Sequence, residues 1–398
     1  MMIEKRSFYL LPTIVIAQFC CTSLWFAGNA VLSDLALTFN LQSSALGHLT
    51  SAVQFGFISG TLLFAMLSIA DRFSPSKVFF YCALFGALFN MGMIWEKHSL
   101  VSILSIRFLT GFFLAGIYPV GMKIAADHYE KGLGKSLGFL VGALVLGTAF
   151  PHLLKELMAT VEWKSVMMAT SALAVSGGLL MMWLVPNGPY QKKSQRIQLS
   201  AFLKVFKNQP FRTAAIGYFG HMWELYAFWA FVPVILKTYL TRHPTSTFNL
   251  SLMSFFVIGI GGFGCVLGGY VAQRLGTKRT AFIALLLSCI CCLFSPLMFS
   301  IELESLFIGF LLFWGICVIA DSPLFSTLVA QNAPIAMKGT ALTIVNCIGF
   351  SITIISIQLI NGLREVIESD GLFMILALGP ILGLIALARN KKVSLNSF

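Results

Sequence analysis

Three formally charged side chains lie deep inside apolar stretches of this sequence: Arg107, Glu224 and Asp321. An ionisable group in hydrocarbon costs at least ~2.5–3.5 kcal/mol, so it usually faces a cavity or a partner. Burial favours the neutral form of a carboxyl, and a second carboxyl nearby strengthens that preference. Glu224 and Asp321 are therefore candidates for binding and releasing a proton, Glu224 being the first and Asp321 the second.

Two further residues bear on this proton chemistry. His221 stands three residues before Glu224, on the same face of a helix, where it can tune or share the proton of the acid. Arg107 can reach the membrane interface, pair with an acid, or bind an anionic solute. The alternative is a static ion pair between Arg107 and one of the acids, which would only fix helix packing.

A polar stripe runs along the first apolar segment. Gln18, Thr22, Trp25 and Asn29 follow one another at spacings of 4, 3 and 4, which places them on one helical face. Such a face can line a cavity and bind a solute. The alternative is hydrogen bonding between helices, worth ~0.6 kcal/mol per contact.

Aromatic side chains with few polar groups are typical of small-molecule sites, although they also pack helix bundles. The candidates that would complete the cavity are Tyr118, Trp223, Tyr226, Trp229 and Asn346.

The composition indicates where these residues lie. Of the 398 residues, 58% are hydrophobic and only 11% are charged, against about 25% charged in soluble proteins. The chain must turn much of its surface toward lipid. Its net charge of +12 does not indicate nucleic-acid binding, because the basic residues are scattered over short loops between apolar runs.

Twelve apolar runs are long enough to cross ~30 Å of hydrocarbon as helices. Unbroken runs exclude membrane β-strands, which alternate with polar residues. The sequence therefore predicts an all-α membrane protein with spans at 8–32, 45–70, 78–95, 100–122, 136–154, 165–185, 213–236, 250–272, 280–300, 305–331, 339–361 and 371–388.

Basic residues predict the orientation. Most of the 27 lysines and arginines fall in alternate loops, which places both termini in the cytoplasm. The longest loop, a basic linker at 186–212, separates a six-helix bundle at 1–185 from another at 213–398. Glu224 lies 11 residues, and Asp321 10 residues, from the cytoplasmic end of its span. At the rise of a helix both carboxyls are therefore expected about 15 Å from the cytoplasmic surface, near the bilayer centre.

The two halves repeat each other. Gly111 and Pro119 recur as Gly315 and Pro323, and Trp25 recurs at 229, all shifted by 204 positions. Parallel repeats of this kind predict pseudo-symmetric bundles with a solute site between them at mid-membrane.

The whole chain resembles the major facilitator superfamily. The loop that follows the second span keeps Asp71-Arg72 and Lys77 of that family's pattern, but Ser74-Pro75 replaces its glycine-arginine step. The fourth span carries Arg107 and Gly111, similar to the family's R-x-x-x-G motif. The resemblance implies that spans 1, 4, 7 and 10 line the cavity. It also implies a cytoplasmic gate of charge contacts, for which simple anchoring by basic residues is the alternative; the gate residues are Asp71, Arg72, Arg274 and Lys278.

No phosphate-binding loop, zinc-ligand pattern or nucleophile motif occurs in the sequence, so no enzyme activity, metal or cofactor is expected. The nine cysteines are expected to pack in the interior. We expect a monomeric secondary active transporter in a bacterial inner membrane that moves a small organic solute, with protons as the coupling ion.

Two alternatives remain for this function. A nitrate/nitrite-type anion porter is disfavoured, because such porters rely on arginines within spans 2 and 8, which hold none here. A transport-inactive receptor or scaffold with the same fold would tolerate loss of the intramembrane charges.

Overall fold

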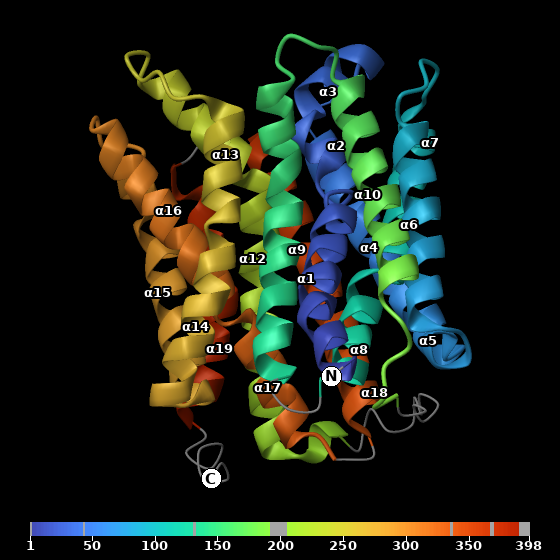
Figure 1. Cartoon of the computed structure of the whole chain (residues 1–398). Coiled ribbons are helices and arrows are strands. Elements are labelled where there is room, and N and C mark those ends of the chain that lie inside the picture. The colour runs from blue at the N-terminus through green and yellow to red at the C-terminus, as the bar shows by residue number, and fades with distance from the viewer. Residues whose placement is uncertain are drawn as a thin grey trace. The chain divides into compact units, whose positions relative to one another are not determined.

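The computed structural model describes residues 2–42, 44–129, 133–191, 205–334, 337–366 and 370–389, and every regular element in this part of the chain is a helix (Figure 1). The predicted all-helical fold is confirmed. The chain divides into two compact units, Met1–Arg196 and Ile197–Phe398, called unit 1 and unit 2 below. Unit 1 contains α1 (Met2–Thr22), α2 (Ala27–Ala30), α3 (Leu32–Phe39), α4 (Ala45–Met66), α5 (Ile69–Arg72), α6 (Pro75–Gly92), α7 (Leu100–Leu114), α8 (Tyr118–His128), α9 (Leu133–Leu157) and α10 (Lys164–Leu184). Unit 2 contains α12 (Gln209–Arg242), α13 (Leu250–Gly259), α14 (Gly261–Leu275), α15 (Thr277–Met298), α16 (Glu304–Ala320), α17 (Ser322–Asn332), α18 (Lys338–Val366), the 3-10 helix η2 (Asp370–Ala377) and α19 (Leu378–Arg389).

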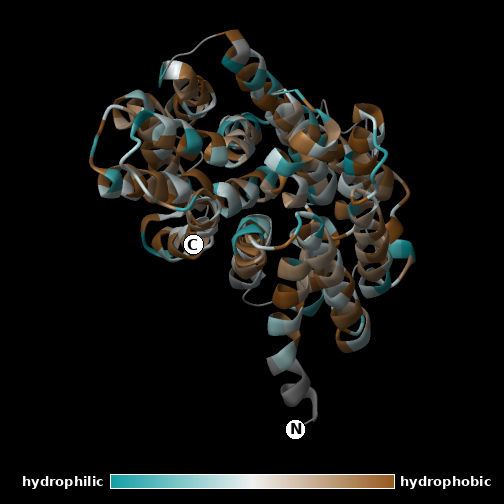
Figure 2. Cartoon of the chain, turned by 90° about the horizontal axis from the view of Figure 1, so that it is seen from above, coloured by the Kyte–Doolittle hydropathy of each residue, from teal (hydrophilic) through white to brown (hydrophobic). Residues whose placement is uncertain are grey.

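Apolar helices dominate both units. Within the described residues, ten helical segments are long and apolar enough to cross a membrane, and α1 adds a shorter apolar stretch, Tyr9–Thr22. Figure 2 shows hydrophobic residues along most of the helices, with many of the polar residues in the connections. Large apolar side chains such as Leu88, Phe263 and Ile355 are more than half exposed on their helices, which suits contact with lipid.

Several of the predicted spans are interrupted helices. The segment predicted at 100–122 divides into α7 and α8, and the one at 305–331 divides into α16 and α17 at Asp321. In each case a proline, Pro119 or Pro323, lies in the first turn of the second piece. An N–H at that position makes no hydrogen bond within the helix, so proline removes none. The two interruptions lie 204 positions apart, the shift that the sequence repeat predicts.

The same close helix contact occurs once in each unit. A Cβ on Gly111 of α7 would lie 2.0 Å from the carbonyl oxygen of Val53 in α4, and a Cβ on Gly315 of α16 would lie 2.1 Å from that of Val257 in α13. Both partners are again 204 positions apart. Small residues at such crossings allow two backbones to touch, which is how helices associate in lipid.

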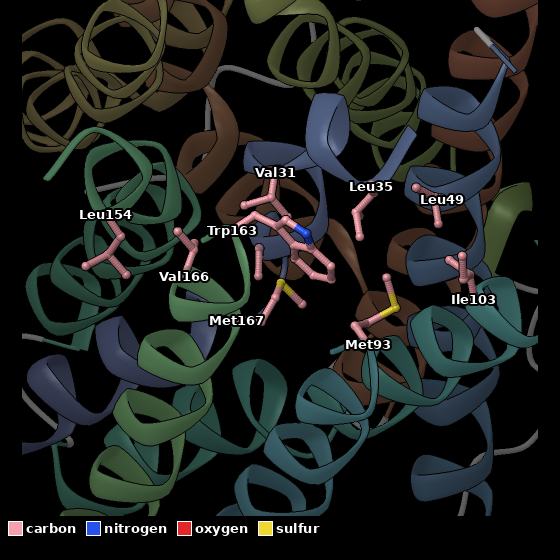
Figure 3. Packing of buried hydrophobic residues seen from close by; sticks show 10 residues of the cluster. Val31, Leu35, Leu49, Met93, Ile103, Leu154, Trp163, Val166 and Met167 are labelled. Atoms are coloured by element: carbon pink, nitrogen blue, oxygen red, sulfur yellow. The ribbon is translucent and has the colours of Figure 1, made fainter. Parts of the chain in front are cut away.

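Side chains beyond the end of α1 form a buried apolar cluster in unit 1 (Figure 3). Val31, between α2 and α3, and Leu35 of α3 pack there with Leu49 of α4, Ile103 of α7 and Met167 of α10. The cluster fixes α2 and α3 to the rest of unit 1, although the chain between Thr22 and Ala27 is not helical.

Candidate functional site

Glu224 lies in the interior of unit 2, with 1% of its surface exposed. One of its carboxyl oxygens, Oε1, accepts hydrogen bonds from three donors on two neighbouring helices. Trp314 of α16 donates from Nε1 at 2.7 Å, the Cys292 thiol of α15 donates at 3.2 Å, and the Ser288 hydroxyl of α15 donates as well. The indole N–H can only donate, so this arrangement fixes the carboxyl oxygen as an acceptor.

Asp321 lies at the interruption between α16 and α17 and is equally buried. His221 of α12 places Nδ1 2.8 Å from its Oδ1. The sequence suggests that His221 shares the proton of Glu224, whereas the structure joins it to Asp321. A buried imidazole in contact with a carboxyl can hold one proton more or one proton fewer, so this pair can change its charge by one unit.

The chain positions this pair through the helix interruption. Asp321 is both the C-cap of α16 and the N-cap of α17. Its counterpart 204 positions earlier, the residue directly before α8, is the apolar residue Ile117. The repeat therefore supplies the same break in both units, but only unit 2 carries an acid there.

Arg107 is fully buried in unit 1 and binds oxygens other than those of a carboxylate. Its guanidinium donates to the backbone oxygens of Leu24 at 3.3 Å and Trp25 at 2.6 Å, and lies 3.4 Å from Oδ1 of Asn90. In the described part of the chain it forms no ion pair, so neither snorkelling nor pairing with an acid describes its position. The C-terminal end of a helix carries a partial negative charge, which suits a cation there.

Asn90 connects this arginine to α10. Its amide nitrogen lies 3.0–3.2 Å from the backbone oxygen of Met167 and from the hydroxyls of Thr170 and Ser171. The network therefore runs from α10 through α6 and α7 to the end of α1. Sequence reasoning missed Asn90, although a lone asparagine in an apolar run is the signal that would identify it.

The polar stripe of the first span is not one helical face, because α1 ends at Thr22 and Ser23–Phe26 forms turns. All four stripe residues are nevertheless buried. Thr22 donates to the backbone oxygen of Gln18 at 2.9 Å, Asn29 donates to Thr50 at 2.8 Å, and the Trp25 ring packs on Phe57 at 4.8 Å. Gln18 lies against α8, where a Cβ on Gly121 would lie 2.2 Å from its Oε1.

The aromatic candidates of α12 contact neighbouring helices in different ways. Tyr226 packs between Trp229, at 5.2 Å, and Phe350 of α18. The Trp223 indole donates to the backbone oxygen of Ile375 in η2. Among the other candidates, Tyr118 at the start of α8 and Asn346 on α18 are half-buried.

At the far end of unit 1 from α3, the gate candidate Asp71 is part of a charge cluster (Figure 1). Lys123 of α8 lies 3.0 Å from Asp71 and 3.4 Å from Asp127. The sequence gives Lys123 no individual role. Arg72 and Arg274 are exposed, and Lys278 is half-buried in the first turn of α15.

The chain that follows α10 returns to this cluster. The Tyr190 N–H donates to the backbone oxygen of Asp127 at 3.0 Å, and Ser74 and Ser76 each donate at 2.7 Å, to Asn187 Oδ1 and to the Val185 carbonyl. These are the serines around the position where the sequence departs from the family pattern. The first residues of the predicted linker are thus bound to unit 1.

Replacement of Gly188 by valine is expected to detach this segment. A Cβ on Gly188 would lie 2.2 Å from the Asp127 backbone oxygen, and neither backbone can move aside cheaply. Limited trypsin digestion should then cut the basic 186–212 stretch severalfold faster than in the wild type. Gly309→Val is the matched control, since a Cβ there meets no atom within 4 Å; equal cleavage in both variants would contradict the docking.

Comparison with known proteins identifies the family. A sequence profile described as Major Facilitator Superfamily matches residues 14–357. The chain belongs to the Major Facilitator Superfamily. It is therefore a multi-pass membrane protein of a transporter family and not an enzyme.

Relatives within the superfamily are distant. Proteins described as probable sugar efflux transporters, from Helicobacter pylori strains G27 and HPAG1, are 22% identical over 347 residues and 84% of each chain. The proton:xylose symporter XylE is similar in structure, with a TM-score of 0.74 at 13% identity, covering 97% of this chain and 96% of XylE. A mutant of the nucleoside transporter NupG gives 0.72 at 15% identity, covering 96% and 99%. These structures establish the fold alone.

Proposed function

We propose that the chain is a secondary active transporter that moves a small organic solute by alternating access and couples the movement to protons. The observation that carries the proposal is the buried His221–Asp321 pair at a helix interruption. Interrupted membrane helices are typical of transporter sites, because they bring backbone and side-chain polar groups together where a rearrangement can occur.

The proton step follows from the chemistry of the pair. With neutral His221 and ionised Asp321, the pair carries one negative charge. Uptake of one proton by the imidazole gives a neutral ion pair, and its release restores the charge. A change of one charge in a low-dielectric interior alters the stability of the arrangement by several kcal/mol, which is enough to favour one conformation over another.

Glu224, which the sequence ranks first for this step, is placed second in this proposal. Its Oε1 oxygen is bound by donors from α15 and α16, so loss of its charge would weaken several bonds at once. We assign the proton exchange to the His221–Asp321 pair first and retain Glu224 as a participant that fixes α12 against its neighbours.

Topology and location follow as part of this proposal. We infer twelve spans, with α1 and α6 added to the ten long apolar segments, and cytoplasmic termini in a bacterial inner membrane. The Asp71–Lys123 contact would belong to the cytoplasmic gate, with Arg72, Arg274 and Lys278. Sugars and nucleosides are the first solutes to test, because the named relatives transport them.

Purified protein in proteoliposomes tests the proposal. We expect a proton gradient to drive accumulation of a labelled sugar or nucleoside by the wild type. Asp321→Asn should abolish accumulation while solute exchange without a gradient persists, and Glu224→Gln should reduce both. Glu302→Gln, at an exposed acid, is the control. Unchanged accumulation in Asp321→Asn would remove the pair from coupling, and absence of any solute flux in the wild type would favour a receptor.

A further inference from the structure

Gln54 of α4 is a buried residue to which the sequence analysis assigned no role. Its side chain is 0% exposed. Within the described residues, neither its amide oxygen nor its amide nitrogen has a hydrogen-bond partner. A buried polar group without a partner is destabilising, so this amide is a candidate for a functional role.

The neighbours of Gln54 along α4 show which way it faces. Thr50, four residues earlier, accepts the hydrogen bond of Asn29, and Phe57, three residues later, packs on Trp25. Residues at these spacings share one helical face. Gln54 therefore lies on the face that α4 turns toward the interruption between α1 and α2.

Other polar atoms at this interruption lack partners as well. Gln18, about one turn before the interruption, is 0% exposed with both amide atoms unpaired, and Oδ1 of Asn29 is unpaired and buried. Meanwhile Arg107 holds the freed backbone oxygens of Leu24 and Trp25. The backbone oxygens of Leu24 and Trp25 are thus satisfied. The unpaired polar atoms include those of the neutral amides and, on the cation, Nε of Arg107.

We propose that Gln54 is a specificity-determining residue that binds the transported solute at the interruption of the first span, together with Asn29. This inference rests on the proposed transport function and adds the class of solute. Amides supply both donors and acceptors, which match a hydroxyl group, since a hydroxyl also donates and accepts. Within the described residues, the formal charge at the break is that of Arg107, whose two terminal nitrogens already bind three oxygens, so that only its Nε lacks a partner. The solute is therefore neutral and hydroxylated, and the Trp25 ring offers an apolar surface for its carbon face.

Replacement of Gln54 by methionine tests this role, because methionine keeps the length of the side chain and removes its hydrogen bonds. Without solute, Gln54→Met should melt about 2–6 °C higher than the wild type, since it no longer buries an unpaired amide. With xylose or uridine as the probe, the variant should lose the solute-induced rise in melting temperature. Its half-saturation concentration for transport of that probe should rise about tenfold to a hundredfold, as expected for one or two lost hydrogen bonds.

The control and the contrary outcomes separate this inference from the function itself. Gln331→Met, at an exposed glutamine of α17, should behave as the wild type. A lower melting temperature with unchanged half-saturation would show that Gln54 only holds the fold, and it would leave transport intact. Transport of anionic solutes alone would overturn the neutral solute class. If no solute moved in the wild type, the transport function itself would fail. If Gln54→Met does not yield folded protein, the same assays on Gln54→Asn decide the point, because a shortened amide should lower affinity without abolishing it.

Discussion

Replacement of Gly111 by valine is expected to lower the melting temperature of unit 1 by about 6–12 °C and to abolish transport. The reason is the contact between α7 and α4, where a Cβ would lie 2.0 Å from the Val53 oxygen and 2.8 Å from its carbonyl carbon. Both obstacles are backbone atoms, so the helices must separate. Overpacking of this kind costs about 3 kcal/mol at the upper end of its usual range, and each kcal/mol shifts the melting temperature by about 2–4 °C at this size.

Gly138→Val provides the control for this prediction. Gly138 also lies inside a helix of unit 1, but a Cβ there meets no atom within 4 Å. Both variants therefore carry the same change in helix propensity, and they differ only in the clash. Thermal unfolding in detergent, monitored by size-exclusion chromatography, should give a lower melting temperature for Gly111→Val than for Gly138→Val. Equal melting temperatures would show that α4 and α7 do not touch as described. The sequence repeat also predicts that Gly315→Val behaves as Gly111→Val does.

The sequence was sufficient to predict the helices and the internal repeat, because both leave periodic signals. Unbroken apolar runs favour helices in lipid, and the shift of 204 between Gly111 and Gly315 reappears in the contacts that these glycines make. The interruptions were not predicted. A break in an apolar run changes neither its length nor its composition, and Pro119 and Pro323 are tolerated in membrane helices as well as at their first turns.

The partners of the candidate site residues show the same limit. Helical spacing placed His221 beside Glu224, but a residue on a buried helix has neighbours on several sides, and His221 meets Asp321 of another segment. The partner of Asp71 lies 52 positions away, at Lys123. Long-range contacts of this kind depend on how the helices pack, which local periodicity does not encode. Arg107 likewise binds backbone oxygens, which any residue could supply.

Replacement of Arg107 is expected to reduce the maximal transport rate at least tenfold, and the stability of two variants should separate charge from hydrogen bonding. In Arg107→Lys the buried charge remains, but a single ammonium cannot reproduce a fork that reaches Leu24, Trp25 and Asn90. A poorly paired buried charge costs about 3–5 kcal/mol. In Arg107→Met the oxygens that the guanidinium holds lose their partner, at about 1–3 kcal/mol each. Arg107→Lys leaves most of the same oxygens unpaired and still buries a cation, so it carries the larger cost.

The order of stability should therefore be wild type first, Arg107→Met second and Arg107→Lys last, as measured by thermal unfolding. This order is the reverse of the one that a substitution table gives, because lysine is the more similar residue to arginine. If Arg107→Lys melts as the wild type does, any cation suffices at this position. If Arg107→Met transports normally, the bonds to the first span are dispensable. Loss of transport in both variants, with the methionine variant the more stable, would mean that the interruption after α1 needs its backbone oxygens held in place for the solute to move.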